Sequence, residues 1–420
     1  MTFSVRNLIN HLAVFVIFSD AFSSSVFFTY FDLRGSYFIL PIVSILCILV
    51  LGKLCFSKKF IMIFGMIILF AIYSIFVGKN TIPLMSKAVI GIFLNSLTFY
   101  MVFKLNNYDV KKLFVIYLNI AFFAGLVGLA QETGSMLNIL PQLMRPYQLG
   151  DLPLYRITSF FPEPAHFVEA MMPAFFVSLV SVLQKNPLLD KWKSWVIIIS
   201  FLLSFSTIGY IGVFLSILLV IINYGKIRQV LVGALLIPLL SFIVYTNVAE
   251  VKRRVDDSFN VITGASELLS ANLSTFALMS NWGVGYRSFL DNPVFGSGLG
   301  SHKISYYKNI NIVIDDDIDA AQQRGIIALN VEDAGSLFNR LLSETGLFGL
   351  FTFMLFIYKA HILRKNDKSN YLWIINNAIL AFFLIKLLRG GHYFLYGTFF
   401  FFWAYYFSKM QSREMSRVFK

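Results

Sequence analysis

The stretch WVIIISFLLSFSTIGYIGVFLSILLVIIN (195–223) decides the fold, because it runs without a charged residue for longer than one crossing of a bilayer requires. A membrane-spanning helix takes about 20 apolar residues. The rest of the chain has the same character: of its 420 residues 57% are hydrophobic, 14% are charged and 46 are Phe. Soluble proteins are about 25% charged, so this composition excludes a soluble enzyme, a disordered chain and a nucleic-acid-binding module. We predict an all-α polytopic membrane protein.

Apolar runs near the length of one span predict about 12 transmembrane helices. They lie at about 9–31, 36–52, 60–78, 82–103, 113–131, 166–184, 190–206, 207–225, 229–247, 346–358, 371–388 and 393–408. The stretch 195–223 counts as two spans, because Ser204, Ser206, Thr207 and Gly209 suit the tip of a hairpin. One long tilted helix is the alternative, and it would invert the topology of everything before it.

The basic residues indicate which side of the membrane is cytoplasmic. The N-terminus, the loops on its side and the C-terminal tail hold 20 of the 35 basic residues, against four acidic ones. The short loops on the other side hold only Arg34, Lys79, Arg145, Arg156 and Arg389. The positive-inside rule therefore predicts that both termini are cytoplasmic. The net charge of +13 then reflects topology and contact with anionic membrane lipid, and no nucleic-acid partner is expected.

The chain divides into three parts. Residues 1–247 hold the first nine spans and an outer loop at 131–165, residues 248–345 form one large outer loop, and residues 346–420 hold the last three spans and a cytoplasmic tail. The large loop is longer than ordinary connections, so we expect it to be functional and to contain short helices. Chemistry on this face cannot draw on cytoplasmic nucleotides. A donor must arrive already activated, most simply as a lipid-linked phosphate.

Neither the cysteines nor the acidic run predicts a metal site. Cys47 and Cys55 lie near the inner end of the second span, and no His/Cys group has the spacing of zinc ligands. The run Asp315-Asp-Asp-Ile-Asp319 is interpreted as a solvated acidic loop rather than a metal site for a sugar nucleotide. We predict no metal and no cofactor.

The densest cluster of ionisable residues is RITSFFPEPAHFVE (156–169). Pro164 suits the first turn of a helix, so Glu163 would lie at the positive helix start with His166 one turn later. Arg156 precedes them in an extended stretch and could reach an anion at the same rim. A charged helix cap with side chains that snorkel to the interface is the alternative.

Three further segments carry chemistry on the outer face. Arg287 precedes DNPVFGSGLG (291–300), whose alternating glycines allow close backbone approach to a ligand or form a simple turn. The segment 332–349 leads into a span and contains Asn339 and Glu344, either sugar-hydroxyl ligands or polar residues at the aqueous end of a helix. The hairpin between the last two spans carries RGGH (389–392).

In this order, these motifs resemble the O-antigen ligase/polymerase superfamily of bacterial inner-membrane glycan enzymes. Members commonly show an Arg before Phe-x-Glu-Pro, a Ser-rich "SRTG" hairpin, a long periplasmic loop with "NPLFGVGLG", and "E-x-G-L-x-G" opening the next span. Here the corresponding segments are Arg156 to Pro164, Ser206 to Gly209, Asn292 to Gly300 and Glu344 to Gly349. The match covers roughly residues 150–350. It implies a GT-C-like glycosyltransferase architecture.

The resemblance implies transfer of a growing glycan from undecaprenyl pyrophosphate to a sugar hydroxyl of a new lipid-linked repeat unit. Guanidinium groups suit the charge that develops on the departing pyrophosphate. The candidate catalytic residues are Arg156, Glu163, His166 and Arg287. The candidate pyrophosphate ligands are Arg156, Arg287, Arg389 and His392, and the candidate glycan ligands are Tyr155, Asn339 and Glu344. A polysaccharide chain-length regulator is a further candidate partner.

Two departures from the pattern favour a Wzy-type polymerase over a lipid A–core ligase. Gly335-Ser336 stands where ligases usually carry His-Asn, and Thr207 replaces the arginine of "SRTG". A ligase remains the nearest alternative. A flippase for lipid-linked oligosaccharide is the second alternative, although it would carry inverted repeats and charges at the bilayer midplane.

Overall fold

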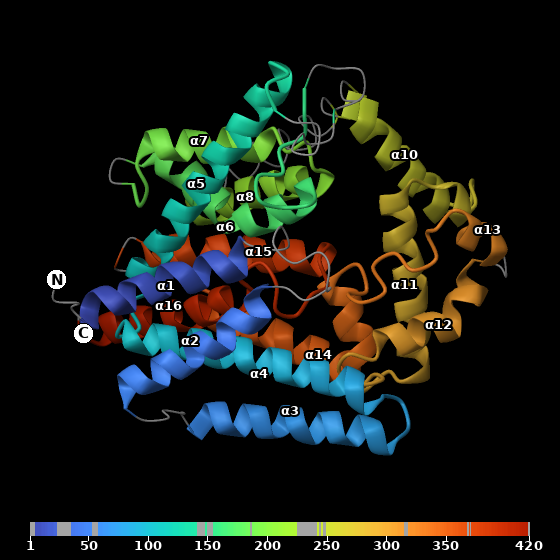
Figure 1. Cartoon of the computed structure of the whole chain (residues 1–420), viewed down its shortest axis with the longest axis horizontal. Helices are drawn as coiled ribbons and strands as arrows, with labels where there is room; N and C mark the ends of the chain where they lie inside the picture. The colour runs from blue at the N-terminus through green and yellow to red at the C-terminus, as the bar shows by residue number, and fades with distance from the viewer. Residues whose placement is uncertain are drawn as a thin grey trace.

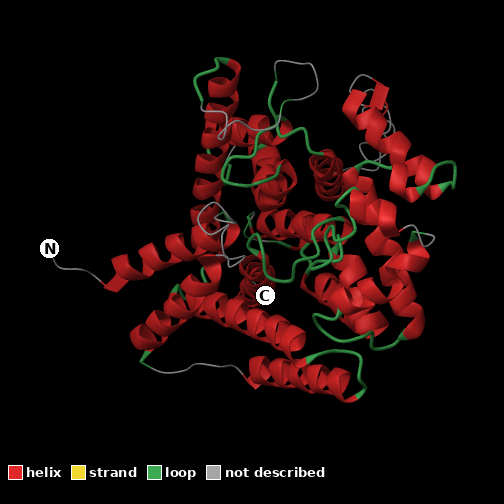
Figure 2. Cartoon of the chain, turned by 45° about the vertical axis from the view of Figure 1, so that its right-hand side comes forward, coloured by secondary structure: helices red, strands yellow, loops and turns green. Residues whose placement is uncertain are grey.

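The structure is a computed structural model of the whole chain. It describes residues 5–22, 35–52, 58–140, 148, 154–184, 187–224, 242, 245–246, 249–314, 318–367, 369 and 371–418. Over these ranges the chain forms helices joined by turns and no named strand, as Figure 2 shows. One isolated bridge pairs Gln148 with Tyr155. The predicted all-helical class is confirmed for these ranges.

Most of the helices overlap predicted apolar runs, and residues 23–31 of the predicted span 9–31 lie outside the described residues. They are α1 (Val5–Ala21), α2 (Gly35–Leu51), α3 (Lys58–Phe76), α4 (Ile82–Leu105), α5 (Val110–Met136), α6 (Pro164–Leu183), α7 (Lys191–Leu202), α8 (Thr207–Tyr224), α10 (Ala249–Ile262), α11 (Leu273–Asp291), α12 (His302–Val313), α13 (Ile318–Gln323), α14 (Leu337–Ala360), α15 (Leu372–Leu388) and α16 (Thr398–Val418). Two short 3₁₀ turns, η3 (Leu268–Ser270) and η4 (Arg364–Asn366), complete them. The predicted span 229–247 lies almost wholly outside the described residues.

Within the described residues, five helices, α4, α5, α6, α8 and α14, are long and apolar enough to cross a membrane. Shorter apolar helices lie in α1, α2, α3 and α15. Several helices of a membrane protein are therefore present, while the predicted count of twelve crossings stays a prediction. α16 begins five residues later and ends ten residues later than the predicted span 393–408.

The charge-free stretch 195–223 forms two helices, so one long tilted helix is excluded. α7 ends at Leu202, and Phe205 adopts a left-handed backbone with φ 46°. The hydroxyl of Ser204 donates to the carbonyl of Phe201 over 2.6 Å and closes the last turn. The polar residues thus form the hairpin tip that the sequence predicts.

α14 contains a kink at the residue where the predicted span 346–358 begins. Gly346 has φ 60° and ψ −157°, outside the helical region. A Cβ atom there would lie 2.6 Å from the carbonyl oxygen of Val294. The helix itself starts earlier, at Leu337, where the Ser336 hydroxyl accepts a hydrogen bond from the amide of Asn339. The buried first turns of α14 are therefore polar and lie beyond the apolar run.

The two ends of the bundle differ in content. In Figure 1, α1 begins and α16 ends on the left, whereas α11, α12 and α13 lie together on the right. α14 starts and α15 ends on the side of α11–α13, and we call this the motif end. The arrangement separates the termini from the segment 249–345.

α15 forms the centre of the bundle. All but two of its 17 residues are buried, and it packs against α6, α16, α8 and α14. Large apolar side chains face outward elsewhere, as at Phe76 (87% exposed), Leu49 (70%) and Leu69 (69%). Apolar residues on both the inside and the outside are typical of a protein surrounded by lipid.

The segment 249–345 has a small core of its own. Phe276 and Val284 of α11 pack with Tyr306 and Ile310 of α12. The short helices expected in the large loop are therefore present. They connect to the bundle through α14.

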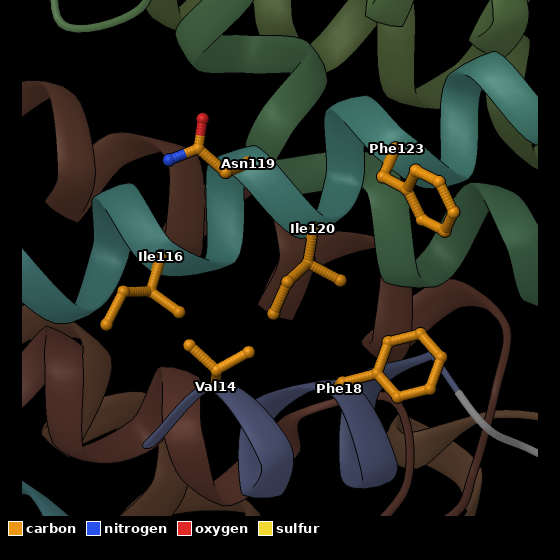
Figure 3. A pocket seen from close by; sticks show the side chains of 6 residues that line it. All are labelled: Val14, Phe18, Ile116, Asn119, Ile120 and Phe123. Carbon is orange, nitrogen blue, oxygen red and sulfur yellow. The ribbon is translucent and has the colours of Figure 1, made fainter. Parts of the chain in front are cut away.

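An apolar groove of about 380 Å³ lies between α1 and α5. Val14 and Phe18 project from α1 toward Ile116 and Ile120 of α5 (Figure 3). None of the predicted site residues is among the described residues that line it.

Candidate functional site

The two glycine-containing motifs form one structural unit at the motif end. The segment 292–300 lies against the kink of α14, and backbone hydrogen bonds join the two. They run from Ser297 N to Ser343 O (3.0 Å), from Gly298 N to Glu344 O (2.7 Å), from Leu347 N to Pro293 O (2.9 Å) and from Phe348 N to Val294 O (3.0 Å). Two motifs that are about 45 residues apart in the sequence therefore hold each other in place.

The glycines of segment 292–300 are required by this close approach. Gly296, Gly298 and Gly300 have φ values of 65°, 103° and 83°, which other residues rarely adopt. A Cβ atom at Gly296 would overlap the backbone of Glu344, and one at Gly300 would lie 2.6 Å from the carbonyl oxygen of Leu84. The segment is thus a packed junction between α4 and α14.

The carboxylate of Glu344 is the polar centre of the junction. It is 1% exposed and accepts hydrogen bonds at both oxygens. The amide of Gly300 and the hydroxyl of Tyr393 donate to Oε2, each over 2.7 Å. Nε of Arg340 donates to Oε1 over 3.1 Å, and the amide of His302 does so over 3.4 Å.

Arg340 was not among the predicted site residues, although its place in the structure is central. Its Nη1 donates to the carbonyl of Gly391 over 3.1 Å, and its guanidinium lies 4.2 Å from the centre of the Tyr393 ring. The signal in the sequence was the spacing of Arg340 and Glu344, four residues apart on one helix face. Buried charges need such partners.

His302 closes the buried network on the side of α11. Its Nε2 lies 3.0 Å from Oδ1 of Asn281, and its Nδ1 lies 3.0 Å from the hydroxyl of Ser343. The amide nitrogen of Asn281 donates to two backbone carbonyls, so Asn281 Oδ1 accepts from His302 Nε2–H and His302 Nδ1 accepts from Ser343. Burial, with a further contribution from Arg340, lowers the pKa of His302 to about 3. The imidazole is therefore neutral at physiological pH.

Asn339 and Glu344, the candidate glycan ligands of α14, are buried and already hydrogen-bonded. The amide nitrogen of Asn339 donates to the carbonyls of Asn281 (2.7 Å) and Ala334 (3.0 Å). A Cβ atom at Gly285 would overlap this amide. Sugar binding by Asn339 and Glu344 stays a prediction, and it would require these contacts to exchange.

The start of α6 has the predicted geometry. Glu163 is the N-cap, with extended backbone at φ −134° and ψ 147°, and Pro164 is the first helical residue. The Glu163 carboxylate is exposed and makes no capping hydrogen bond. The His166 ring stacks on Tyr396, with centroids 5.1 Å apart. α6 thereby meets the hairpin 389–397.

Arg156 and Tyr155 lie beside the hairpin between α7 and α8. The amide of Tyr155 donates to both carboxylate oxygens of Glu132, at 2.9 and 3.1 Å. Arg156 is half-buried and near enough to Tyr210 of α8 for a charge interaction with its hydroxyl. The motif that contains Arg156 thus lies beside the hairpin 203–209. The order of the motifs in the sequence does not predict this contact.

A second buried ion pair connects α6 to α15. Nζ of Lys386 lies 2.7 Å from Oε1 of Glu169, and their side chains are 0% and 6% exposed. In the sequence, Glu169 lies in the cluster 156–169 and Lys386 lies near the end of the predicted span 371–388, and nothing indicates that they pair. In an apolar bundle, each charge makes burial of the other possible.

Arg389 and His392 lie together in the hairpin, whereas Arg287 does not lie beside them. Arg389 Nη1 donates to the carbonyl of Ser274 over 3.4 Å, and His392 Nε2 lies 3.3 Å from Oδ2 of Asp333. Arg287 is exposed on the same helix as Ser274, 13 residues further along. At 1.5 Å per residue this separates the two positions by about 20 Å.

Metal ligands do not converge in the part of the chain that the structure describes. No group of three or more His, Cys, Asp or Glu side chains is placed there to hold an ion. Asp315, Asp316 and Asp317 of the acidic run lie outside the described residues.

Comparison with known proteins agrees with the motifs. The family model Wzy_C, described as O-antigen ligase, matches residues 193–354. This range covers less than half of the chain and includes the hairpin 203–209, the segment 292–300 and the kink of α14. The comparison with curated proteins gives no match. The family match confirms the predicted resemblance to the O-antigen ligase/polymerase superfamily over residues 193–354.

Proposed function

We propose that the chain polymerises undecaprenyl-pyrophosphate-linked oligosaccharide repeat units at the periplasmic face of a bacterial inner membrane, making O-antigen or a related surface polysaccharide. The family match supports a glycosyltransferase-like enzyme of O-antigen ligase/polymerase type. The polymerase assignment rests on Gly335-Ser336 and Thr207, which depart from the ligase pattern.

One observation carries the choice of reacting groups. Of the four glutamates in the motif segments, Glu169 and Glu344 are buried in ion pairs. Glu332 forms ion pairs with Lys87 and Lys303, whereas Glu163 is exposed and forms no ion pair among the described residues. Glu163 also lies one turn before His166, which contacts the hairpin carrying Arg389. An exposed carboxylate suits an acceptor hydroxyl, and a guanidinium on the contacting hairpin suits a departing pyrophosphate.

In the proposed reaction, a sugar hydroxyl displaces the lipid pyrophosphate from the anomeric carbon. A sugar hydroxyl of the new repeat attacks the anomeric carbon of the growing glycan, and the bond from that carbon to the pyrophosphate oxygen breaks. The hydroxyl proton passes to a base, for which Glu163 or His166 is the candidate. Undecaprenyl pyrophosphate leaves as an anion, stabilised by Arg156, Arg389 and His392. Arg287 would bind the lipid pyrophosphate at a different stage, given its distance from Arg389.

No metal is expected in this reaction, because pyrophosphate is already a good leaving group. The positive-inside distribution and the separation of the motif end from the termini (Figure 1) support catalysis on the outer face.

The matching family model is described as O-antigen ligase, so a ligase that transfers finished polymer to lipid A core is the second candidate function. The glycan pattern of a deletion strain separates the possibilities. Loss of a polymerase leaves one repeat unit on the core. Loss of a ligase leaves bare core and lipid-linked polymer, and this outcome would overturn the proposal. Elongation of lipid-linked repeats by the purified protein separates an enzyme from a flippase.

A further inference from the structure

The hairpin 389–397 holds its two candidate anion ligands on either side of a glycine pair. Arg389 precedes Gly390-Gly391, and His392 follows. Gly390 has φ 89°, and its amide donates to the carbonyl of Gly335 over 3.1 Å. Two adjacent glycines make a flexible backbone, so the direction of Arg389 and His392 depends on what fixes this pair.

The first glycine abuts the ion pair between α6 and α15. A Cβ atom at Gly390 would overlap the carboxylate of Glu169, which is held by Lys386 at 2.7 Å. The backbone at Gly390 is thus confined between this carboxylate and the carbonyl of Gly335.

The second glycine is held by the ion pair of α14. Arg340, paired with Glu344 at 3.1 Å, donates through Nη1 to the carbonyl of Gly391. Tyr393, two residues further, donates to the same Glu344 and lies under the same guanidinium. A Cβ atom at Gly391 would overlap the carbonyl of Asp333. The hairpin is therefore fixed from two sides.

Stability alone does not explain two buried ion pairs in an apolar bundle. Desolvation of buried charges offsets much of their attraction, and apolar replacements of similar volume are often no less stable. Both pairs contact the two residues that separate Arg389 from His392, which indicates that they fix a geometry.

We propose that Glu169–Lys386 and Arg340–Glu344 are positioning pairs, which clamp Gly390 and Gly391 so that Arg389 and His392 face one bound lipid pyrophosphate in a single orientation. The identity of the ligand rests on the proposed function, whereas the clamp is a property of the chain itself. The pairs act on the ligand only through the hairpin.

The clamp is tested by hydrogen–deuterium exchange of the full chain in lipid nanodiscs. Two double variants, Glu169→Gln with Lys386→Met and Arg340→Met with Glu344→Gln, remove each pair without leaving one charge unpaired. We expect amides of 389–397 to exchange about tenfold faster, while α11 exchanges as in the wild type. Unchanged exchange at 389–397 in both variants would overturn the clamp.

A glycine substitution gives a test that leaves every charge in place. Gly390→Ala puts a methyl group against Glu169, whereas Gly264→Ala, with a similar φ of 73°, meets nothing within 4 Å. We expect faster exchange at 389–397 for Gly390→Ala alone. Equal behaviour of the two variants would count against the clamp.

The kinetics of glycan transfer then distinguish a positioning role of the two ion pairs from a role in protein stability alone. We expect each double variant to keep the wild-type Tm within a few degrees and to lower kcat about 100-fold, as displaced reacting groups do. Arg340→Lys, which keeps the charge, should recover part of kcat. Variants with normal Tm and normal kcat would overturn the positioning role. A wild-type protein that elongates no lipid-linked glycan would overturn the proposed function instead, and the exchange result would still decide the clamp.

Discussion

The hydroxyl group of Tyr393 and the carboxylate of Glu344 lie 2.7 Å apart in a buried site where the hairpin after α15 meets the start of α14. Glu344 also receives the amide of Gly300. One carboxylate thus joins the segment 292–300, the kinked helix and the hairpin that carries Arg389 and His392.

Tyr393→Phe is expected to destabilise the protein by about 2 kcal/mol, because a buried charged acceptor loses one donor while the ring is retained. The fall in Tm of the purified protein measures this effect. Tyr358→Phe is the matched control, since Tyr358 is 80% exposed and lies on α14, the helix that carries Glu344. Equal Tm values for the two variants would contradict the role given to the hydroxyl.

Arg156→Ala is expected to abolish polymer while the single-repeat glycolipid remains. The substitution removes a fixed cation for the departing pyrophosphate but leaves the synthesis of the repeat unit intact. Gel separation of the glycans from a complemented deletion strain shows the difference. Arg253→Ala, on exposed α10, controls for loss of an arginine. An unchanged polymer ladder in an Arg156 variant expressed at normal levels would contradict the role of Arg156 in the proposed reaction.

Alanine substitutions of Arg389 and Arg287 are expected to lower activity to different extents. Arg389 contacts Ser274 of α11, and about 20 Å separates Ser274 from Arg287 along that helix. Arg389→Ala should lower kcat/KM for the lipid-linked donor about 100-fold, whereas Arg287→Ala should lower it less than about tenfold. Steady-state kinetics with purified protein measure both. Equal losses would show that the two arginines bind one ligand after a rearrangement of α11.

Most of the helices could be predicted from the sequence because they depend on local signals, whereas the outer location of the motifs stays a prediction. Runs of apolar residues indicate spans, and Pro164 after Glu163 indicates the start of α6. The structure confirms the start of α6 and the break within 195–223.

The pairing of buried charges could not be predicted, because it depends on how the helices pack. Glu169 and Lys386 lie 217 residues apart, and nothing local identifies Lys386 as the partner of Glu169. Arg340 looked like one polar residue at the end of a span, and only the fold shows it between Glu344 and Gly391. The separation of Arg287 from Arg389 likewise follows from the length of α11.

Glu163→Gln is expected to lower kcat by about 100-fold or more, because an amide cannot accept the proton of the acceptor hydroxyl. KM for the lipid-linked substrates should change little. Glu267→Gln is a close control, since Glu267 is also an exposed N-cap without a side-chain capping bond. Wild-type kcat in the Glu163 variant would remove this carboxylate from the reaction and leave His166 as the candidate base.

The buried His302 is expected to make the protein less stable in mild acid. Its pKa is about 3 in the folded chain, lowered by burial and then by Arg340, against an ordinary value of 6.5. Below pH 6.5 His302 binds a proton in the unfolded chain but stays unprotonated in the folded chain. The free energy of unfolding therefore declines from its value above pH 6.5 as the pH falls toward 3. At pH 5 this one group contributes a loss of roughly 2 kcal/mol. His302→Gln cannot take up the proton, so its Tm should fall less than that of the wild type between pH 7.5 and pH 5, even if it starts lower. His11→Gln, at an exposed position of α1, should keep the wild-type dependence, and an unaltered dependence in the His302 variant would assign the acid sensitivity to other groups.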